Sequence, residues 1–405
     1  MSPPDAERAV AAFLEERTGR HCLVVPSGRL ALYLALRTWL APGDRVLMSP
    51  LNDDVVLFVV LAAGLRPVMA PVSAEDGNID PGSVPEATWS SLGGVLTTNL
   101  YGLPDRVAEL GDRCRRLGIP LIEDAAHALE SQVDGRPVGS FGAAAAFSLS
   151  KHAAAGGGGV LAFADPACRH RLAALRQAVL RPRRWRLAAD LTLPAAERLV
   201  YRLRLVRVAR SLRRGLGLAE RSAYRMPLRA PRLGHAVAAA PELDRFDPWV
   251  RVDLHGYRRR HRAFQLRRML TCLHDLERRR ALRTAGVRRL AALPAAAPAV
   301  RRPPLQPLFR VPLLVPDRDA VVAELLRRQL PMGYLYDPPL DDYAGPGLVE
   351  PSPDPEVARW WASRALPVDP LDAGRVLGVL DGLGILDGPA PAGDRRRERS
   401  AQCPT

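Results

Sequence analysis

One lysine stands out among the residues of this sequence that could do chemistry. Of the 58 basic residues, Lys151 is the only lysine and the other 57 are arginines. A lysine amine can lose its proton when desolvated and form a Schiff base with a carbonyl, which a guanidinium cannot do. Lys151 could be a chance survivor of the arginine bias, but it lies between an apolar run, 147–149, and four glycines, 156–159. We therefore interpret it as an amine kept for covalent chemistry.

A carboxylate that precedes this lysine indicates which carbonyl the amine would capture. Asp124 ends the apolar segment 120–124, and His127 follows closely. Pyridoxal phosphate needs an amine for its aldehyde and a carboxylate that keeps its pyridine nitrogen protonated. The alternative for Asp124 is a helix N-cap after a strand, and His127 either contacts the cofactor or caps local backbone. The pattern predicts pyridoxal 5'-phosphate as cofactor and Lys151, Asp124 and His127 as catalytic residues.

The elements that must position these side chains alternate between strands and helices. An amphipathic helix is expected at 5–18, and later helices at 30–40, 55–63 and 106–117. Short apolar strands are expected at 23–25, 45–48, 67–72, 94–98, 120–124, 147–149 and 160–163. This order predicts an α/β fold in which a mostly parallel sheet is sandwiched by helices. Such sheets bind ligands at the carboxyl ends of their strands, where Ser27, Asp124 and Lys151 all fall.

The turn between the first strand and the next helix suggests a place for a phosphate group. Ser27, Gly28 and Arg29 form this turn. The first N–H groups of a helix are unpaired and lie at the positive end of its dipole, so they attract anions. Many strand-to-helix turns look similar, so this motif alone does not indicate a phosphate site. It does so here because Asp124 and Lys151 lie on the same predicted sheet.

The composition excludes several classes of protein. With 47% apolar and 25% charged residues, the chain is typical of a soluble globular protein. No apolar run could span a bilayer, and the polar, acidic start does not fit a secretory signal. Five scattered cysteines without a CxxC pair predict no disulfide framework, no metal site and a reducing, cytoplasmic location. The net charge of +15 comes without a nucleic-acid-binding motif, so we expect no nucleic-acid partner.

Composition and hydrophobic periodicity also predict how the chain is divided into domains. A second, smaller α+β domain is indicated by a helical stretch over 244–276, with 258–260 on a solvated face, then a strand at 309–315 and helices at 318–330, 357–365 and 374–380. We expect six parts: an N-terminal helix (1–20), a large domain (21–164), a basic helical excursion (165–220), a return segment (221–243), a small domain (244–387) and a disordered tail (388–405).

The basic excursion allows two interpretations. Arginines alternate with aliphatic residues through 181–214, which would suit contact with an anionic membrane surface. The same pattern suits a helical excursion whose arginines face water or cover apolar surface with their stems, and we favour this second interpretation.

An ordered set of motifs resembles the DegT/DnrJ/StrS family of sugar aminotransferases, which are fold-type I pyridoxal-phosphate enzymes. The resemblance is dense over 22–163 and looser afterwards. It rests on the segments 27–32, 41–46, 64–72, 78–80, 99–102, 118–127, 135–142, 147–151 and 156–159, with weaker echoes at 224–226, 336–340 and 366–368.

The resemblance implies a role for each matching residue. Lys151 would hold the cofactor as an aldimine, Asp124 would partner the pyridine nitrogen, and His127 would lie near the ring. Gly28 and Arg29 would present backbone N–H groups to the phosphate, and Ser148 a hydroxyl. The implied reaction moves an amino group from glutamate or glutamine to a keto sugar, usually nucleotide-linked, or a cyclitol. The family also implies a homodimer.

The sequence departs from the family pattern at several points, and the first two of these motivate an alternative. Asp53 stands where relatives place an aromatic residue that stacks on the cofactor, and Ala223 where the partner subunit extends an asparagine. The spacing from Ser148 to Lys151 matches a shorter variant of the family motif. The alternative is a catalytically reduced cofactor-binding or scaffold protein of the same fold, associated with a membrane surface through 181–214. A dehydratase of the family fits less well, because that branch replaces the lysine with histidine.

Overall fold

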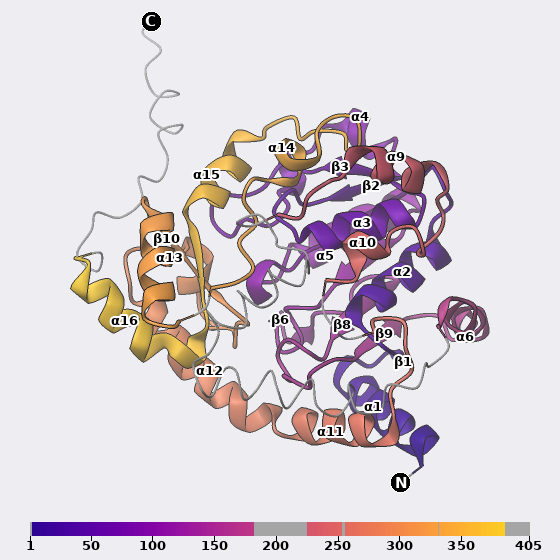
Figure 1. Ribbon diagram of the computed structural model, residues 1–405, viewed down its shortest axis with the longest axis horizontal. Coiled ribbons are helices and arrows are strands. Elements are labelled where there is room, and N and C mark those ends of the chain that lie inside the picture. The colour runs from indigo at the N-terminus through magenta and orange to yellow at the C-terminus, as the bar shows by residue number, and fades with distance from the viewer. Residues whose placement is uncertain (1, 182–224, 253–255, 331, 385–405) are drawn as a thin grey trace, which may run out of the picture.

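A computed structural model describes residues 2–181, 225–252, 256–330 and 332–384, and its centre is a seven-stranded sheet (Figure 1). The strands are β1 (His21–Val25), β2 (Arg45–Met48), β3 (Arg66–Met69), β4 (Gly94–Thr97), β5 (Leu121–Asp124), β8 (Ala144–Ser148) and β9 (Gly159–Phe163). Their order is β1-β9-β8-β5-β4-β2-β3. Only β9 runs antiparallel to its neighbours within this sheet. The predicted α/β class with a mostly parallel sheet is confirmed.

Helices cover both faces of the sheet because its strands are apolar on both sides. The covering helices are α1 (Pro3–Thr18), α2 (Gly28–Trp39), α3 (Asp54–Ala62), α5 (Val107–Leu117), α10 (Asp247–Val250) and α11 (Ala263–His274). One core cluster joins α2, α3 and α10 to residues such as Ile122 and Phe163. On the opposite face, α1 and α11 pack on Phe147 and Val160, and α5 packs on Val95 and Leu121.

Shorter elements surround this layered core. The hairpin formed by β6 (Gln132–Val133) and β7 (Arg136–Pro137) lies between β5 and β8 in the chain. The remaining helices outside the small domain are α4 (Glu86–Trp89), α6 (Cys168–Val179) and α9 (Ala230–Ala238). Single 3₁₀ turns occur at η1 (Pro81–Ser83) and η2 (Leu100–Gly102). Helix α6 is the described part of the predicted basic excursion, and residues 182–220 of that prediction lie outside the described residues.

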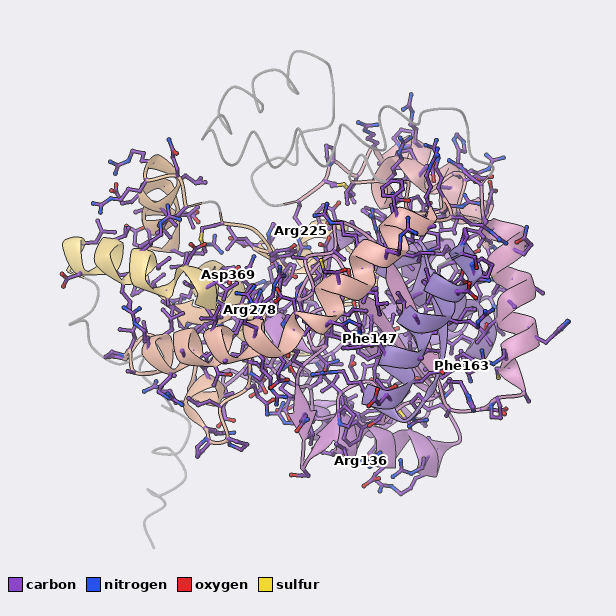
Figure 2. All side chains as sticks on the ribbon, turned by 90° about the horizontal axis from the view of Figure 1, so that it is seen from below. Arg136, Phe147, Phe163, Arg225, Arg278 and Asp369 are labelled. Carbon is purple, nitrogen blue, oxygen red and sulfur yellow. The ribbon has the colours of Figure 1, made fainter. Side chains whose placement is uncertain are left out.

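A second core cluster gathers most of the C-terminal elements, and we propose that these elements form the small domain. The C-terminal elements are α12 (Leu276–Ala291), η3 (Pro298–Arg301), β10 (Val311–Leu314), α13 (Arg318–Arg327), α14 (Leu340–Ala344), α15 (Glu356–Arg364), β11 (Ala365–Val368), η4 (Pro370–Asp372) and α16 (Ala373–Gly382). Of these, α14 packs in the cluster of the large sheet through Leu340. Strands β10 and β11 pair antiparallel, and most of the helices pack around them. Helices α11 and α12 follow each other across the molecule and connect the two cores, as the view from below shows (Figure 2).

The region 244–276 differs from the prediction of one strong helical stretch. After α10, residues 256–262 are not helical, and Arg258 is buried rather than on a solvated face. Its guanidinium donates to Val179 O at 2.7 Å and pairs with Asp244. Helical periodicity alone could not reveal that this arginine closes the end of α6. Residues 246–276 pack with the clusters of the large sheet, so we propose that the small domain begins at α12.

Two searches of the described residues gave negative results. No helix in the described ranges is long and apolar enough to cross a membrane. Within the same ranges, no group of three or more histidine, cysteine or acidic side chains could hold a metal ion. The predicted tail, 388–405, lies outside the described residues.

Candidate active site

A cavity of about 730 Å³ opens at the carboxyl ends of the parallel strands. Its lining brings together every residue that the sequence singled out for the site: Gly28, Arg29, Asp124, His127, Ser148 and Lys151. Ser27 lines it as well. The three segments that carry these residues follow β1, β5 and β8. Their convergence follows from the sheet topology, because the carboxyl ends of parallel strands share one edge.

Lys151 lies just past β8, and its amine is covered by an aromatic ring. The side chain is half-buried, and Nζ lies 3.7 Å from the centroid of the Tyr334 ring. The Phe309 ring is the next aromatic group, 5.9 Å from Nζ. Among the described residues, Nζ forms no hydrogen bond and no ion pair within 4.0 Å. The contacts of the amine are therefore with aromatic rings, and its nitrogen can still bond to a ligand in the cavity.

Alternation along β5 separates two neighbouring carboxylates into different roles. Glu123 points away from the cavity and accepts backbone N–H groups of Gly139, Phe141 and Gly142 at 2.7 to 2.8 Å. Asp124, on the opposite face, lines the cavity and is 8% exposed. Burial raises the Asp124 pKa to about 6, although Lys151 and a hydrogen bond from Ala126 oppose the rise. A cationic ligand group beside Asp124 would lower this pKa again by favouring the ionised form.

Asp124 also has the local backbone role that was considered as its alternative. Its Oδ1 accepts a hydrogen bond from Ala126 N–H at 3.0 Å, which supports the turn after β5. Its backbone carbonyl accepts from Asn99 Nδ2 at 2.9 Å. These bonds fix the position of the carboxylate, and they leave Oδ2 without a hydrogen bond to any residue that the structure describes.

His127 lies in a group of aromatic rings at the cavity wall. Its ring stacks on Phe309 at a centroid distance of 4.7 Å and meets the edge of Tyr334 at 5.2 Å. Burial lowers the His127 pKa well below its ordinary value, and the positive charges of Lys151 and Arg310 act in the same direction. The imidazole is therefore neutral near pH 7. It offers a flat face and a single N–H donor to the cavity.

The opposite end of the cavity has the features of an anion site. Helix α2 begins at Gly28, and the Ser27 hydroxyl caps it by accepting from Leu30 N–H at 3.2 Å. Ser148 and Ser150 hydroxyls lie 2.9 Å apart beside this helix start. A Cβ on Gly159 would lie 2.3 Å from the Ser27 carbonyl carbon, so only glycine lets β9 approach the turn this closely. The resulting cradle joins hydroxyl donors to the positive end of a helix.

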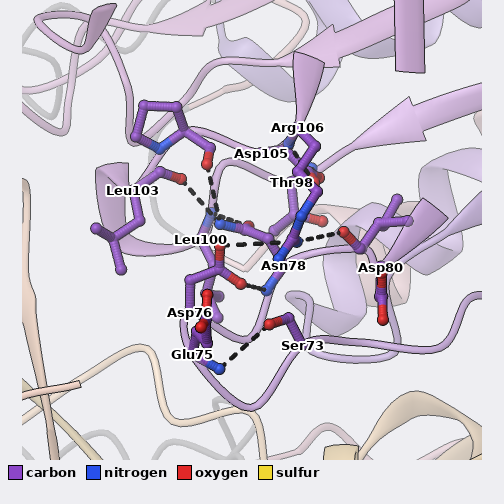
Figure 3. A network of polar contacts seen from close by, with 12 residues as sticks. Ser73, Glu75, Asp76, Asn78, Asp80, Thr98, Leu100, Leu103, Asp105 and Arg106 are labelled. Atoms are coloured by element: carbon purple, nitrogen blue, oxygen red, sulfur yellow. Dashed lines mark hydrogen bonds and ion pairs between the residues drawn. The ribbon is translucent and has the colours of Figure 1, made fainter. Parts of the chain in front are cut away.

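A polar network behind the site holds the loop that carries Tyr101 (Figure 3). Asn78 Oδ1 accepts from Leu100 N–H at 2.8 Å, and its Nδ2 donates to Leu103 O at 3.1 Å. Asp105 accepts from Thr98 N–H and Arg106 N–H. Burial raises the Asp105 pKa to about 7. These bonds hold the left-handed Tyr101 (φ 59°), whose hydroxyl donates to Tyr334 O at 2.8 Å.

The small domain contributes cavity residues to which sequence reasoning gave no site role. Tyr334 and Tyr336 come from the loop after α13 and line the cavity, and Phe309 precedes β10. Tyr334 has a left-handed backbone with φ 66°, an uncommon conformation for a residue with a side chain. Of these segments, only 336–340 showed a weak similarity to the family motifs. Nothing in the sequence placed Tyr334 over the amine.

The structure describes one of the two positions, 53 and 223, at which the sequence lacks the residue expected from the family pattern. Asp53 lines the cavity where the family pattern has an aromatic residue, and its Oδ1 accepts from Val55 N–H at the start of α3. The tyrosine rings that line the cavity are instead those of Tyr257, Tyr334 and Tyr336. Ala223 lies outside the described residues.

Comparisons with known proteins agree with this arrangement. A sequence model of the DegT/DnrJ/EryC1/StrS aminotransferase family matches residues 5–205. One curated relative is the L-glutamine:2-deoxy-scyllo-inosose aminotransferase of Streptomyces kanamyceticus, 31% identical over 175 residues. That match covers 42% of this chain and 41% of the relative. The chain thus aligns with about two fifths of the length of this relative.

Solved structures share the fold over nearly the whole chain. A crystal structure of DesI with its TDP-sugar product superposes with a TM-score of 0.66 at 22% identity, covering 98% of this chain and 87% of the other. The E. coli GDP-4-keto-6-deoxy-D-mannose-3-dehydratase with bound hydrated PLP gives a TM-score of 0.63 at 16% identity, covering 94% and 92%. At these identities the likeness establishes the fold, which is the predicted one.

Proposed function

Because the chain belongs, through residues 5–205, to the DegT/DnrJ/EryC1/StrS aminotransferase family, we propose that it is a pyridoxal-phosphate-dependent aminotransferase. It transfers an amino group from glutamate or glutamine to a keto sugar or a cyclitol. The observation that carries this proposal is the position of the only lysine in the sequence. Lys151 shares one cavity with a strand-end carboxylate and a helix N-terminus.

The residues of the cavity fit the proposed cofactor at three points. The amine of Lys151 suits its aldehyde, Asp124 suits its pyridine nitrogen, and the cradle of Ser27, Gly28 and Ser148 suits its phosphate. Burial raises the Asp124 pKa despite the charge of Lys151, so a cationic ring nitrogen beside this carboxylate would be stabilised by it. When bound, pyridoxal phosphate supplies an aldehyde that an amine can capture and a ring that accepts electrons from the substrate carbon.

The residues of this chain then divide the work of proton transfer and positioning. Lys151 would take and hold the proton of the donor's α-carbon, because its amine lies in the cavity and can both attack a carbonyl and accept a proton. Asp124 would hold the ring nitrogen, and the neutral imidazole of His127, which stacks on Phe309, would offer its face to the ring. Tyr334 lies over the amine and excludes water from it.

Two likenesses support the choice of acceptor class. The Streptomyces kanamyceticus relative is named for a cyclitol ketone, and the DesI structure for a TDP-sugar. We propose an acceptor of one of these two kinds, a homodimer as the working form, and a cytoplasmic site of action. The second candidate is a protein of the same fold that binds the cofactor but has reduced catalytic activity. This candidate is favoured by Asp53, a carboxylate that lines the cavity where the family pattern has a stacking aromatic ring.

The proposal is tested by adding pyridoxal phosphate to the purified protein. Capture of the cofactor aldehyde by the Lys151 amine should produce a visible absorbance band. Borohydride should remove this band and leave the cofactor covalently attached to one peptide. Because Lys151 is the only lysine, mass analysis assigns that peptide without ambiguity. Lys151→Arg, which keeps the charge but not the nucleophile, should lose the band. A wild-type protein that stays colourless with added cofactor contradicts the proposal.

The first half of the reaction, in which the donor gives up its amino group, distinguishes the two candidate functions. Glutamate added to the loaded enzyme should bleach the band and release 2-oxoglutarate in equal amount. A loaded protein that releases neither 2-oxoglutarate from glutamate nor 2-oxoglutaramate from glutamine supports the second candidate. The amino-loaded enzyme is then offered keto sugars and inososes, and the amino product identifies the acceptor.

A further inference from the structure

Directly behind Lys151 lie two buried ionisable side chains that the proposed mechanism does not use. His152 follows the lysine and is 0% exposed, and Glu130, just before β6, is 1% exposed. The distance from His152 Nδ1 to Glu130 Oε2 is 4.0 Å. A direct hydrogen bond needs about 2.7 to 3.2 Å. The two groups therefore face each other across a gap that a small rotation or one water molecule would close.

The polar atoms of this pair lack other hydrogen bonds. Both ring nitrogens of His152 and both carboxylate oxygens of Glu130 have no hydrogen-bond partner among the described residues, and neither has Nε of Arg283. Buried polar groups in native proteins are almost always hydrogen-bonded, because leaving them unpaired costs free energy. Four such atoms on two facing side chains indicate that the partners are each other or a shared water.

The charges around the pair decide which group carries the proton. Those acting on it are Arg17 of α1, Glu277, Arg280 and Arg283 of α12, and Arg310 before β10. Burial and the guanidinium groups together lower the His152 pKa well below its ordinary value. Burial also raises the Glu130 pKa, and the guanidinium groups oppose that rise by favouring the carboxylate. Arg17 lies 3.7 Å from Glu130 Oε1. A neutral imidazole has one N–H, and a carboxylate is the acceptor that faces it on the Nδ1 side.

The pair is joined to Lys151 by short backbone and ring contacts. Residues 151–154 form a tight turn in which Ala154 N–H donates to Lys151 O at 3.2 Å, and Arg279 donates to Ala153 O at 3.1 Å. The His152 ring lies 5.5 Å from Phe309, the ring that also contacts His127 and faces the lysine amine. The turn and the Phe309 ring therefore connect the imidazole to the surroundings of the amine.

We propose that His152 and Glu130 form a buried hydrogen-bonded pair, direct or through one water, that positions Lys151 for capture of its carbonyl ligand. Both are positioning residues: neither lines the cavity. His152 Nδ1–H donates and Glu130 accepts. The positioning of Lys151 rests on the proposed function, whereas the existence of the pair does not.

The existence of the pair is tested by nitrogen NMR of histidine-labelled, full-length protein without cofactor. The wild type should show one histidine locked as the neutral Nδ1–H tautomer, and His152→Asn identifies its signals by their loss. Glu130→Gln, which keeps an acceptor oxygen, should preserve the tautomer, and Glu130→Met should abolish it. A His152 ring that carries its proton on Nε2, or that titrates like an exposed imidazole, overturns the proposal.

The positioning role is tested by the rate at which Lys151 captures pyridoxal phosphate. Glu130→Met and His152→Phe should each slow capture about tenfold, as small displacements of a reacting group do. The double variant should be no slower than either single variant, because both remove the same contact. Multiplied effects in the double variant, or normal rates in folded single variants, would refute the role.

Controls separate this outcome from failure of the proposed function. His274→Phe changes an exposed histidine of α11 and should leave the capture rate unchanged, while the urea midpoint monitors folding of each variant. Asparagine at 152 keeps an N–H donor and should restore most of the rate that phenylalanine loses. If the wild type captures no cofactor, the proposed function fails, and the NMR result still decides whether the pair exists.

Discussion

Replacing Asp124 by asparagine should stabilise the cofactor-free protein at neutral pH while removing its function. Burial raises the pKa of this carboxyl from 3.8 to about 6 in the folded chain. At ~1.4 kcal/mol per pKa unit, ionising Asp124 costs about 3 kcal/mol more in the folded than in the unfolded state. A cofactor nitrogen beside the carboxylate would offset that cost, so the free energy is stored for binding.

The sign of the pH dependence follows from proton binding. Between about pH 4 and pH 6 the folded protein binds the Asp124 proton and the unfolded chain does not, so wild-type stability falls as pH rises. Above about pH 6 both states are ionised and the full cost remains. Asparagine cannot ionise. The free energy of unfolding of Asp124→Asn, relative to wild type, should therefore rise by about 3 kcal/mol between pH 4 and 8.

Urea unfolding of cofactor-free protein at several pH values measures this difference. Asp112→Asn, on the exposed side of α5, serves as the control for losing one negative charge. A difference between Asp124→Asn and wild type that stays flat across the pH range, once the control is subtracted, would refute the assignment of Asp124 as a desolvated carboxyl.

Substitutions at three further positions follow from contacts around the site. Glu123→Gln replaces one accepting oxygen by an NH₂ group that faces backbone donors, so the unfolding free energy should fall by about 1 to 3 kcal/mol in urea; an unchanged midpoint counts against those bonds. Gly159→Ala forces a methyl group into the Ser27 carbonyl and should cost about 1 to 3 kcal/mol and weaken cofactor retention on gel filtration, and unaltered retention would count against the cradle. Tyr334→Ala should uncover the amine and speed acylation of Lys151, followed by peptide mass, whereas Tyr334→Phe should protect it like the wild type because the contact is with the ring face; equal labelling rates would exclude a covering role.

Much of the fold was readable from the sequence because it depends on local patterns. Apolar runs of strand length alternate with amphipathic helices, and this order alone favours a parallel sheet whose ligand site lies at one edge. Lys151 was identifiable because arginine replaced lysine at every other basic position. Asp124, Ser27 and Gly28 followed from their places at the ends of predicted strands.

Contacts between distant segments were not readable, because no local pattern encodes them. The burial of Arg258 depends on the end of α6, which lies far away in the sequence. Tyr334 reaches the amine only because the small domain folds back on the sheet edge. Likewise, nothing in the residues around Glu130 and His152 shows that their side chains face each other.

The sequence by itself determined the chemistry, since residue type decides which group can attack a carbonyl or accept a proton. The tertiary structure decided the environment of each group. Packing places Asp124 out of water and raises its pKa, makes His127 neutral and puts an aromatic ring over the lysine. These effects depend on desolvation and on charges brought together in space, and both exist only after the two cores have packed against each other.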